Sequence, residues 1–301
     1  MKGRTENKIN KFIKKYGEDY LYISPYVILF VVFSIIPVAT SIAWSFTNFN
    51  VFEIPGIVGL KNYFRLFLED EVFILALNNT LLFSIVTGPI SFFLSLMVAW
   101  LVNEFSSLSR TLLTLLFYAP SLSGGVYLVW QLILSNDSFG LLNGFLLNAN
   151  VIDEPIMWTS DSRYMFPAAV SVVLWMSLGT SFLSFIAGFQ NVDRSLYEAG
   201  AMDGVKNRWQ ELWFITLPTM RPQLMFGAVM SITASFGIGD ILTGIFGFPS
   251  TDYKLHTMVH HLQDYGNIRF EMGYASAIAT ILFIIMIGSN KIIQNFLKKI
   301  G

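Results

Sequence analysis

Long apolar stretches alternate with charged or polar segments along the whole chain. Each stretch approaches or exceeds the roughly 20 residues that a helix needs to cross a bilayer. The stretches cover residues 21–46, 72–102, 111–134, 164–190, 222–239 and 272–290, and the fifth extends to residue 248 if Asp240 is included. The pattern therefore predicts an all-α integral membrane protein with six transmembrane helices.

The composition agrees with this pattern. Of the 301 residues, 54% are hydrophobic and 13% are charged, whereas soluble proteins carry roughly 25% charged residues. The mean hydropathy is +0.57. A soluble globular fold is excluded, because its core could not hide so much apolar surface. The chain has no cysteine, so disulfides and thiolate metal sites are excluded as well.

The distribution of lysine and arginine predicts the orientation in the membrane. With the N-terminus inside, fourteen of the nineteen basic residues fall in segments that face the cytoplasm, where such an excess is normal. We therefore expect a basic cytoplasmic N-terminus over residues 1–20 and a single six-helix domain over residues 21–301 with a cytoplasmic C-terminus. The basic N-terminus is interpreted as a retained anchor, not as a cleaved signal or a nucleic-acid site.

Residues 193–218 form a charged, helix-forming loop between the fourth and fifth apolar stretches, on the predicted cytoplasmic side. Ser195 and Glu198 have the spacing of a capping box, which predicts a helix start at Ser195. Gly204 predicts a break, because glycine adopts backbone conformations that other residues disfavour. A second helix is expected through Trp209 and Trp213. Two short helices joined in this way are typical of a rigid docking surface.

This loop resembles the EAA loop of ABC-importer permeases, which has the pattern E-A-A-x-x-x-G followed later by I-x-L-P. Two departures are present: Gly200 stands where a second alanine is usual, and the spacing from Gly204 to Ile215 is one residue longer than the commonest form. The neighbouring residues are similar to those of the carbohydrate, maltose-type branch. The matching positions are Glu198, Ala199, Gly204, Ile215, Leu217 and Pro218.

The resemblance implies that the chain is the permease of a type I ABC importer in a plasma or inner membrane, and not an enzyme. The implied partners are a second, homologous permease, an ABC ATPase dimer, an extracellular solute-binding protein, a carbohydrate and membrane lipid. The chain has no G-x-x-x-x-G-K-[ST] motif, so ATP and magnesium would be bound by the ATPase subunits, and no cofactor or metal is expected here. The implied ATPase-coupling residues are Glu198, Ala199, Gly200, Asp203, Gly204, Trp209 and Pro218.

Two alternatives stay open on the sequence. One is an ABC permease for a non-sugar solute, since a few cavity residues decide the substrate. The other is a secondary transporter that acts alone, for which intramembrane carboxylates or inverted repeats are expected. Asp240 is the ionisable residue that stands out in the apolar stretches. It either contacts the substrate or lies in water at the outer end of its helix, paired with Arg269 or another loop group.

The resemblance also implies a substrate path along the helices that flank the EAA loop. Ser177 and Thr180 are spaced to share one helical face, as are Ser231 and Ser235. Sugars favour hydroxyl partners and an aromatic platform, here Trp175 or Trp130, although small polar faces also serve to pack helices together. The candidate path residues are Trp175, Met176, Ser177, Thr180, Ser231, Ser235, Ile238 and Asp240.

The last predicted outer loop contains His256, His260 and His261. His256 and His260 are one helical turn apart, as in a metal-binding pair, and Asp264 lies one turn further on. We favour a solvated loop or a partner-facing helix, because no carboxylate has convincing ligand spacing. In the second outer loop, the short apolar stretch 141–147 predicts an interfacial helix or a contact for an outside partner.

Overall fold

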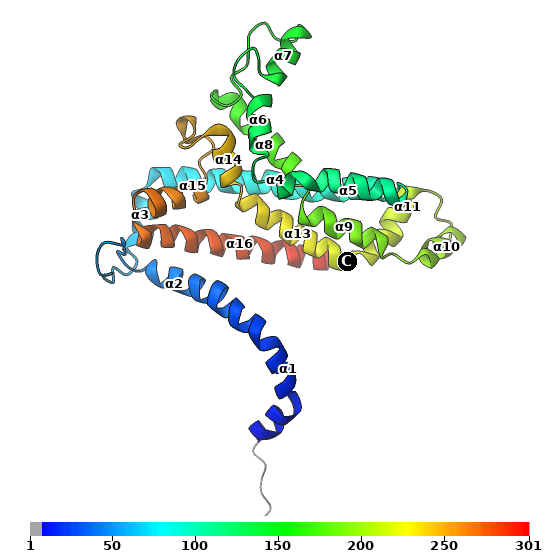
Figure 1. The fold of residues 1–301 in the computed structure, drawn as a ribbon, viewed down its shortest axis with the longest axis horizontal. Helices are drawn as coiled ribbons and strands as arrows, with labels where there is room; N and C mark the ends of the chain where they lie inside the picture. Colours follow the sequence, from blue (N-terminus) through cyan, green and yellow to red (C-terminus); the bar gives the residue numbers. More distant parts are fainter. Residues whose placement is uncertain (1–7, 301) are drawn as a thin grey trace, which may run out of the picture.

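The computed structural model describes residues 8–300, and its regular structure is helical apart from one isolated β-bridge between Thr47 and Ile57 (Figure 1). The elements in chain order are α1 (Lys8–Phe30), the π turn η1 (Val31–Ile35), α2 (Ile36–Trp44), α3 (Lys61–Leu68), α4 (Glu71–Asn103), α5 (Ser107–Leu122), α6 (Tyr127–Ile133), α7 (Leu141–Asn148), α8 (Ser162–Met176), α9 (Thr180–Gln190), α10 (Arg194–Met202), α11 (Arg208–Glu211), the π turn η2 (Leu212–Thr216), α12 (Leu217–Thr219), α13 (Arg221–Phe236), α14 (Gly239–Phe246), the 3₁₀ turn η3 (Thr251–Tyr253), α15 (Met258–Gln263), the π turn η4 (Asp264–Ile268) and α16 (Met272–Ile300).

The helices long and apolar enough to cross a membrane agree with the hydropathy pattern. Three are uninterrupted: Glu18–Trp44 across α1, η1 and α2, then Glu71–Asn103, and Met272–Asn295 within α16. The others are bent pairs, in which α5 meets α6 at 91°, α8 meets α9 at 42°, and α13 meets α14 at 45°. Counting each pair as one span gives up to six spans in the described part of the chain. The predicted all-helical membrane fold is confirmed.

The bent spans are interrupted where the sequence contains glycine. Gly124 and Gly125 separate α5 from α6, Gly179 lies between α8 and α9, and Gly237 lies between α13 and α14. Glycine costs more backbone entropy in a helix than other residues do. A helix that is otherwise apolar therefore bends most easily at these positions.

At the centre of the bundle, α4 packs against α9 and α13. Phe182 and Phe185 of α9 are fully buried, and the Phe185 ring meets Phe92 of α4 edge-on at 5.4 Å. On the α13 side, Gly227 lets the same ring approach the backbone so closely that an added methyl group would collide with it. This tight fit of a large ring against a small residue fixes α9 and α13 on α4.

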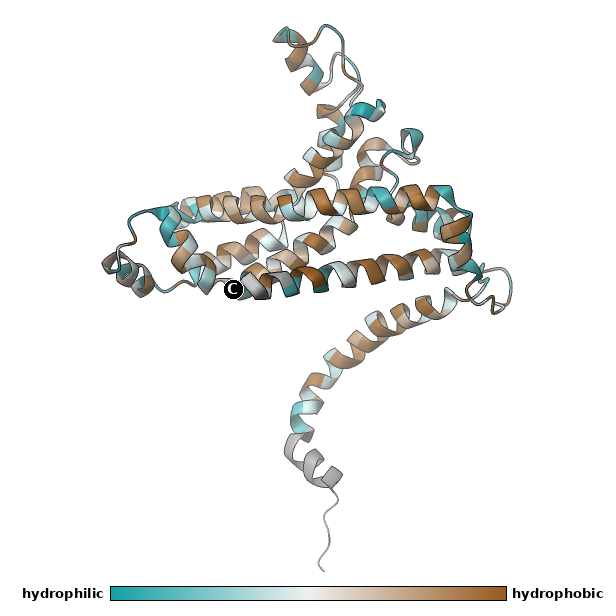
Figure 2. Cartoon of the chain, turned by 180° about the vertical axis from the view of Figure 1, so that it is seen from behind, coloured by the Kyte–Doolittle hydropathy of each residue, from teal (hydrophilic) through white to brown (hydrophobic). Residues whose placement is uncertain are grey.

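The N-terminal helix leaves the bundle (Figure 1). Within Glu18–Trp44, no residue of the most apolar 18-residue stretch is buried. Figure 2 shows the hydrophobic colouring along this helix. An apolar surface of this length is unstable in water, so lipid or protein must cover it. Of the predicted basic N-terminus, residues 1–7 lie outside the described residues.

The two ends of the bundle carry different elements. The helices α10 and α11 lie at one end, and α3 and α15 lie at the opposite end (Figure 1). The predicted short helix over 141–147 forms α7, which lies at the tip of a projection made by α6 and α8. The loop between the fourth and fifth spans is therefore presented at the end of the bundle.

Candidate functional site

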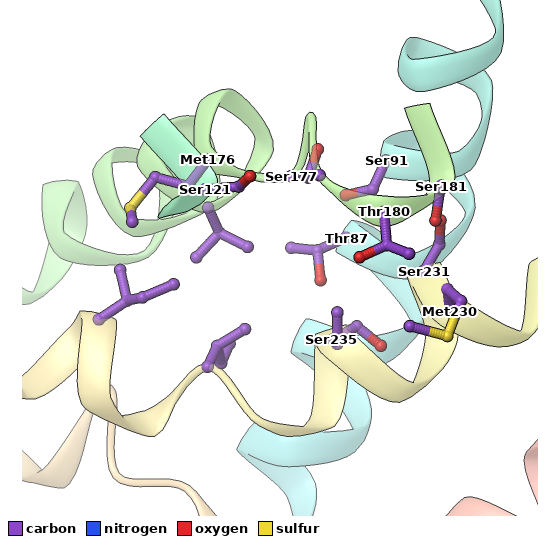
Figure 3. Close-up of a pocket in the computed structure, with 15 residues that line it drawn as sticks. Thr87, Ser91, Ser121, Met176, Ser177, Thr180, Ser181, Met230, Ser231 and Ser235 are labelled. Atoms are coloured by element: carbon purple, nitrogen blue, oxygen red, sulfur yellow. The ribbon is translucent and has the colours of Figure 1, made fainter. Parts of the chain in front are cut away.

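A cavity of about 210 Å³ lies where the bent spans meet the middle of α4 (Figure 3). Side chains from α4, α5, α8, α9, α13 and α14 point toward the same space, and Ser177, Gly179 and Ile238 come from the breaks themselves. The lining residues are Thr87, Ser91, Ser121, Val173, Met176, Ser177, Gly179, Thr180, Ser181, Met230, Ser231, Ala234, Ser235, Ile238 and Ile241.

Hydroxyl groups supply the polar side chains of this cavity. The Ser177 and Ser235 hydroxyls each donate to the carbonyl three residues earlier in the chain, at 2.6 and 2.7 Å. The Oγ atoms of Ser181 and Ser231 lie 3.1 Å apart and so join α9 to α13. A hydroxyl that donates one hydrogen bond can still accept another through its oxygen lone pairs. Among the described lining residues none is charged, so the cavity suits an uncharged solute rich in hydrogen-bond donors.

The structure brings most of the predicted path residues together around this cavity. Those that line it are Met176, Ser177, Thr180, Ser231, Ser235 and Ile238. However, Ser177 and Thr180 do not share the face of one helix, because Ser177 ends α8 and Thr180 begins α9. The prediction of a shared helical face is therefore wrong, although both residues line the cavity, one on each side of the break.

Trp175 and Asp240 do not line the cavity. The Trp175 ring packs edge-on against Trp130 at 5.4 Å and is 43% exposed. Asp240 lies in the first turn of α14 and accepts a hydrogen bond from Gln263 Nε2 at 3.1 Å. Of the two expected kinds of partner, Arg269 or another loop group, the second is found, because Gln263 contacts Asp240 while Arg269 contacts Asp264 at 2.7 Å.

Sequence reasoning missed the contribution of α4. Buried hydroxyl residues recur along this helix every three or four positions, which places them on one face; they are Thr80, Ser84, Thr87, Ser91 and Ser95. A polar stripe of this kind in an apolar span was a readable signal. Ser121 and Ser181 also line the cavity, but neither belongs to a comparable stripe.

The segment between α9 and α13 has the predicted helix–break–helix form. Gly204 has a φ of +94°, which a residue with a side chain rarely adopts. The expected capping role of Glu198 is wrong, because Asp193 caps α10 by accepting from the Ser195 N–H at 3.0 Å. A carboxylate placed one residue before the helix satisfies its first free N–H groups, and Glu198 is left exposed.

Both departures from the EAA pattern have a structural counterpart. A methyl group on Gly200 would lie 2.6 Å from Ile215 Cδ1, so the glycine allows α10 to pack closely on η2. The Tyr197 hydroxyl and Thr216 Oγ1, 2.9 Å apart, hold the same two elements together. The longer spacing from Gly204 to Ile215 coincides with the π turn η2, a turn that accommodates one more residue than an α-helical turn.

The histidine cluster is buried, so the expectation of a solvated loop or partner-facing helix is wrong. His256, His260 and His261 are 2–3% exposed. Burial lowers the pKa of His256 to about 3 and that of His260 to about 4. Within the described residues, no group of three or more His, Cys, Asp or Glu side chains could hold a metal ion.

These histidines connect α15 to the start of α4. His261 Nε2 lies 3.0 Å from Asp70 Oδ2, and His256 Nε2 lies 3.2 Å from His261 Nδ1. Asp70 also accepts from the Tyr274 hydroxyl at 2.7 Å. Burial alone would raise the pKa of Asp70, but hydrogen bonds from His261, Tyr274 and the Phe73 N–H hold it well below its usual range. Asp70 is far from the histidines in sequence, so spacing could not reveal this partner.

Comparison with known proteins identifies the family. Residues 91–300 match the model of the binding-protein-dependent transport system inner membrane component. The chain belongs to this family. It is 31% identical to a probable ABC transporter permease protein YesP of Bacillus subtilis (strain 168), over 89% of this chain and 86% of the relative. It is also 30% identical to the lactose transport system permease protein LacF of Rhizobium radiobacter, over 78% of each chain.

The fold recurs in a solved structure of a bacterial ABC transporter involved in the import of the acidic polysaccharide alginate. The TM-score is 0.79 and the sequence identity 20%, and the match covers 98% of this chain and 100% of the other. The chain is thus a multi-pass permease subunit of an ABC importer in the inner membrane, and not a catalytic subunit. The resemblance based on the EAA loop is confirmed, and a secondary transporter that acts alone is excluded.

Proposed function

We propose that this permease forms part of the translocation path for an uncharged sugar or oligosaccharide delivered by an external solute-binding protein. The observation that carries the proposal is the cavity at the breaks of the bent spans. Broken helices near the middle of a membrane are a recurrent way to build a solute site. Here the cavity walls carry hydroxyl oxygens and apolar surface but no charge.

The chemistry of the lining favours a carbohydrate. A sugar carries many hydroxyl donors, and the hydroxyls of Ser177, Ser181 and Ser235 donate to backbone carbonyls and so retain lone pairs for the solute. The relative LacF is named for lactose transport, which is consistent with an uncharged sugar. A negatively charged solute would find no cation among the described lining residues of this cavity.

The same proposal places a second, homologous permease beside this chain. The uninterrupted helix Glu18–Trp44 is unburied, and a second permease together with lipid would cover it. The second subunit would supply the rest of the cavity wall. With the orientation given by the lysine and arginine distribution, the N- and C-termini and residues 193–218 lie in the cytoplasm.

Residues 193–218 are proposed as the coupling segment on which an ABC ATPase dimer docks. Its candidate contact residues are Glu198, Ala199, Gly200, Asp203, Gly204, Trp209 and Pro218. Met202 and Trp209 are 89% and 63% exposed, so the segment presents uncovered apolar surface, as a docking site does.

The connectivity gives a mechanism for alternating access. The coupling segment joins the end of α9 directly to the start of α13, and these two helices carry Ser181 and Ser231 into the cavity. Movement of the segment by the ATPase subunits would therefore displace both cavity walls. Since α9 and α13 are tightly packed on α4 around Phe185, we expect them to move as rigid bodies.

Reconstitution tests this function. The chain in proteoliposomes with its second permease, ATPase and binding protein should accumulate an uncharged oligosaccharide only when ATP is present. The chain alone should not accumulate sugar, whether or not a proton or sodium gradient is imposed. Accumulation by the lone chain, or ATP-dependent uptake restricted to anionic solutes, would contradict the proposal.

A further inference from the structure

A second cavity, of about 460 Å³, lies between the coupling segment and the adjacent end of the helix bundle. Its walls come from the ends of α4, α5 and α9 on one side and from α10, α11 and η2 on the other. Three guanidinium groups and two carboxylates line it. It is separate from the central cavity, with which it shares no lining residue.

The three arginines differ in how they are paired. Arg208 is neutralised locally, because it contacts Glu211 at 2.7 Å and Glu104 at 3.5 Å. Arg110 donates through Nη2 to the carbonyls of Asn103 and Phe105, at 2.9 and 3.1 Å. Its Nε atom is buried without a hydrogen-bond partner, so the guanidinium retains unused donor capacity.

Arg194 is the first residue of α10 and is one of the residues that line the cavity. In the part of the chain that the structure describes, no carboxylate lies within ion-pair distance of Arg194 or Arg110. Both carboxylates of the cavity are committed to Arg208. The space between the two unneutralised guanidiniums therefore carries an excess of positive charge and of N–H donors.

We propose that this second cavity binds a phosphate group, carried either by a soluble cytoplasmic molecule or by an anionic phospholipid headgroup. Guanidinium donors match the oxygens of a phosphate in geometry and charge. The volume admits a phosphate with further atoms attached.

A bound phosphate would connect the bundle to the coupling segment. Arg110 belongs to α5, whereas Arg194 belongs to α10, so one anion that accepts from both would join these two helices. It would add to the Arg208–Glu104 contact and the Trp100–Trp209 ring contact, which already connect α11 to α4. Occupancy would restrain α10 relative to the membrane helices. The binding itself does not depend on the proposed sugar or on the ATPase.

The test measures binding to the full chain alone in a phosphate-free detergent. One arm titrates inorganic phosphate and follows its ³¹P resonance. The other adds phosphatidylglycerol, with phosphatidylcholine as the headgroup without net charge, and counts retained lipid by native mass spectrometry. A response in the first arm identifies a soluble source, and selective retention of phosphatidylglycerol identifies a lipid source.

Arg194→Gln is the informative variant, because Arg194 is exposed and holds no ion pair that the fold needs. Loss of one charge-assisted contact should weaken binding about tenfold. Arg110→Lys, which keeps the charge but not the planar donor set, should weaken it as well. Arg221→Gln is the matched control: it removes the same charge at the same end of the bundle, from a residue outside the cavity.

The proposal holds if the wild-type chain binds at least one probe, Arg194→Gln weakens that binding, and Arg221→Gln leaves it unchanged. It is overturned if neither probe binds the wild-type chain, or if Arg194→Gln and Arg221→Gln bind equally well. Because no sugar, ATPase or binding protein is present, failure here leaves the proposed transport function untouched.

Discussion

The buried histidines near α15 predict that mild acid destabilises this permease. The pKa of His256 is lowered to about 3 and that of His260 to about 4 by burial, whereas an unfolded histidine titrates near 6.5. Between these values the unfolded chain binds protons that the folded chain does not. The free energy of unfolding is therefore highest above about pH 6.5 and falls as the pH is lowered, because protonation then stabilises the unfolded chain.

The size of the destabilisation follows from the difference between the assay pH and the pKa of an unfolded histidine. At pH 5 the unfolded histidine lies about 1.5 units below its own pKa, and each unit corresponds to about 1.4 kcal/mol. The free energy of unfolding should thus fall by about 2 kcal/mol for each of the two histidines between pH 7 and pH 5. His256→Gln removes one of these titrating groups, so the fall should be roughly halved.

The assay is thermal unfolding of the purified chain in detergent, followed by tryptophan fluorescence at pH 8, 7 and 5. The measurement at pH 8 gives the cost of the His256→Gln substitution itself, since neither His256 nor His260 binds a proton there in either protein. The reasoning is refuted if the wild-type midpoint is the same at pH 7 and pH 5, or if His256→Gln shows an undiminished dependence on pH.

Two further predictions concern transport by the complete importer. Thr180→Val removes one cavity hydroxyl but keeps the shape of the side chain, so uptake should fall about two- to tenfold, which corresponds to the loss of one hydrogen bond. Thr111→Val, outside the cavity, is the control and should leave uptake unchanged. Equal uptake rates in the two variants would remove Thr180 from the path. Gly204→Asp places a side chain at a φ of +94°, so it should abolish ATP-driven uptake without preventing membrane insertion, and wild-type uptake together with normal retention of the ATPase would contradict the docking role.

Much of the architecture was accessible from hydropathy. The predicted spans 72–102 and 272–290 correspond to Glu71–Asn103 and Met272–Asn295. Hydropathy predicts such spans well because an uninterrupted helix needs a continuous run of about 20 apolar residues to cross a bilayer. The bends were not accessible, since hydropathy does not distinguish a straight run from one interrupted at Gly179. Each of the three bent pairs is apolar enough to count as one span, although the helix turns by more than 40° at its break.

The candidate site was accessible in part. The Ser/Thr residues beside the coupling segment could be predicted because they flank a motif. Thr87 and Ser91 lie far from that motif, and their sequence signal is the stripe of hydroxyl residues along α4. The burial of His261 depends on Asp70, which is distant in sequence and close only in the fold. The start of α10 was misplaced because Asp193 and Ser195 are both good capping residues, and sequence alone does not decide between them.

The absence of cysteine from this chain allows a direct test of the central claim that the cavity at the helix breaks is the transport path. The complete importer with a single Thr180→Cys substitution would be treated with a charged thiol reagent, with and without the transported sugar and ATP, and the rate of cysteine labelling measured. The control is Ser107→Cys, at an exposed position at the start of α5 that is remote from the cavity. We predict that sugar slows labelling of Thr180→Cys severalfold and that ATP changes its rate, while Ser107→Cys reacts at a constant rate. Labelling of Thr180→Cys that is indifferent to both sugar and ATP would contradict the account.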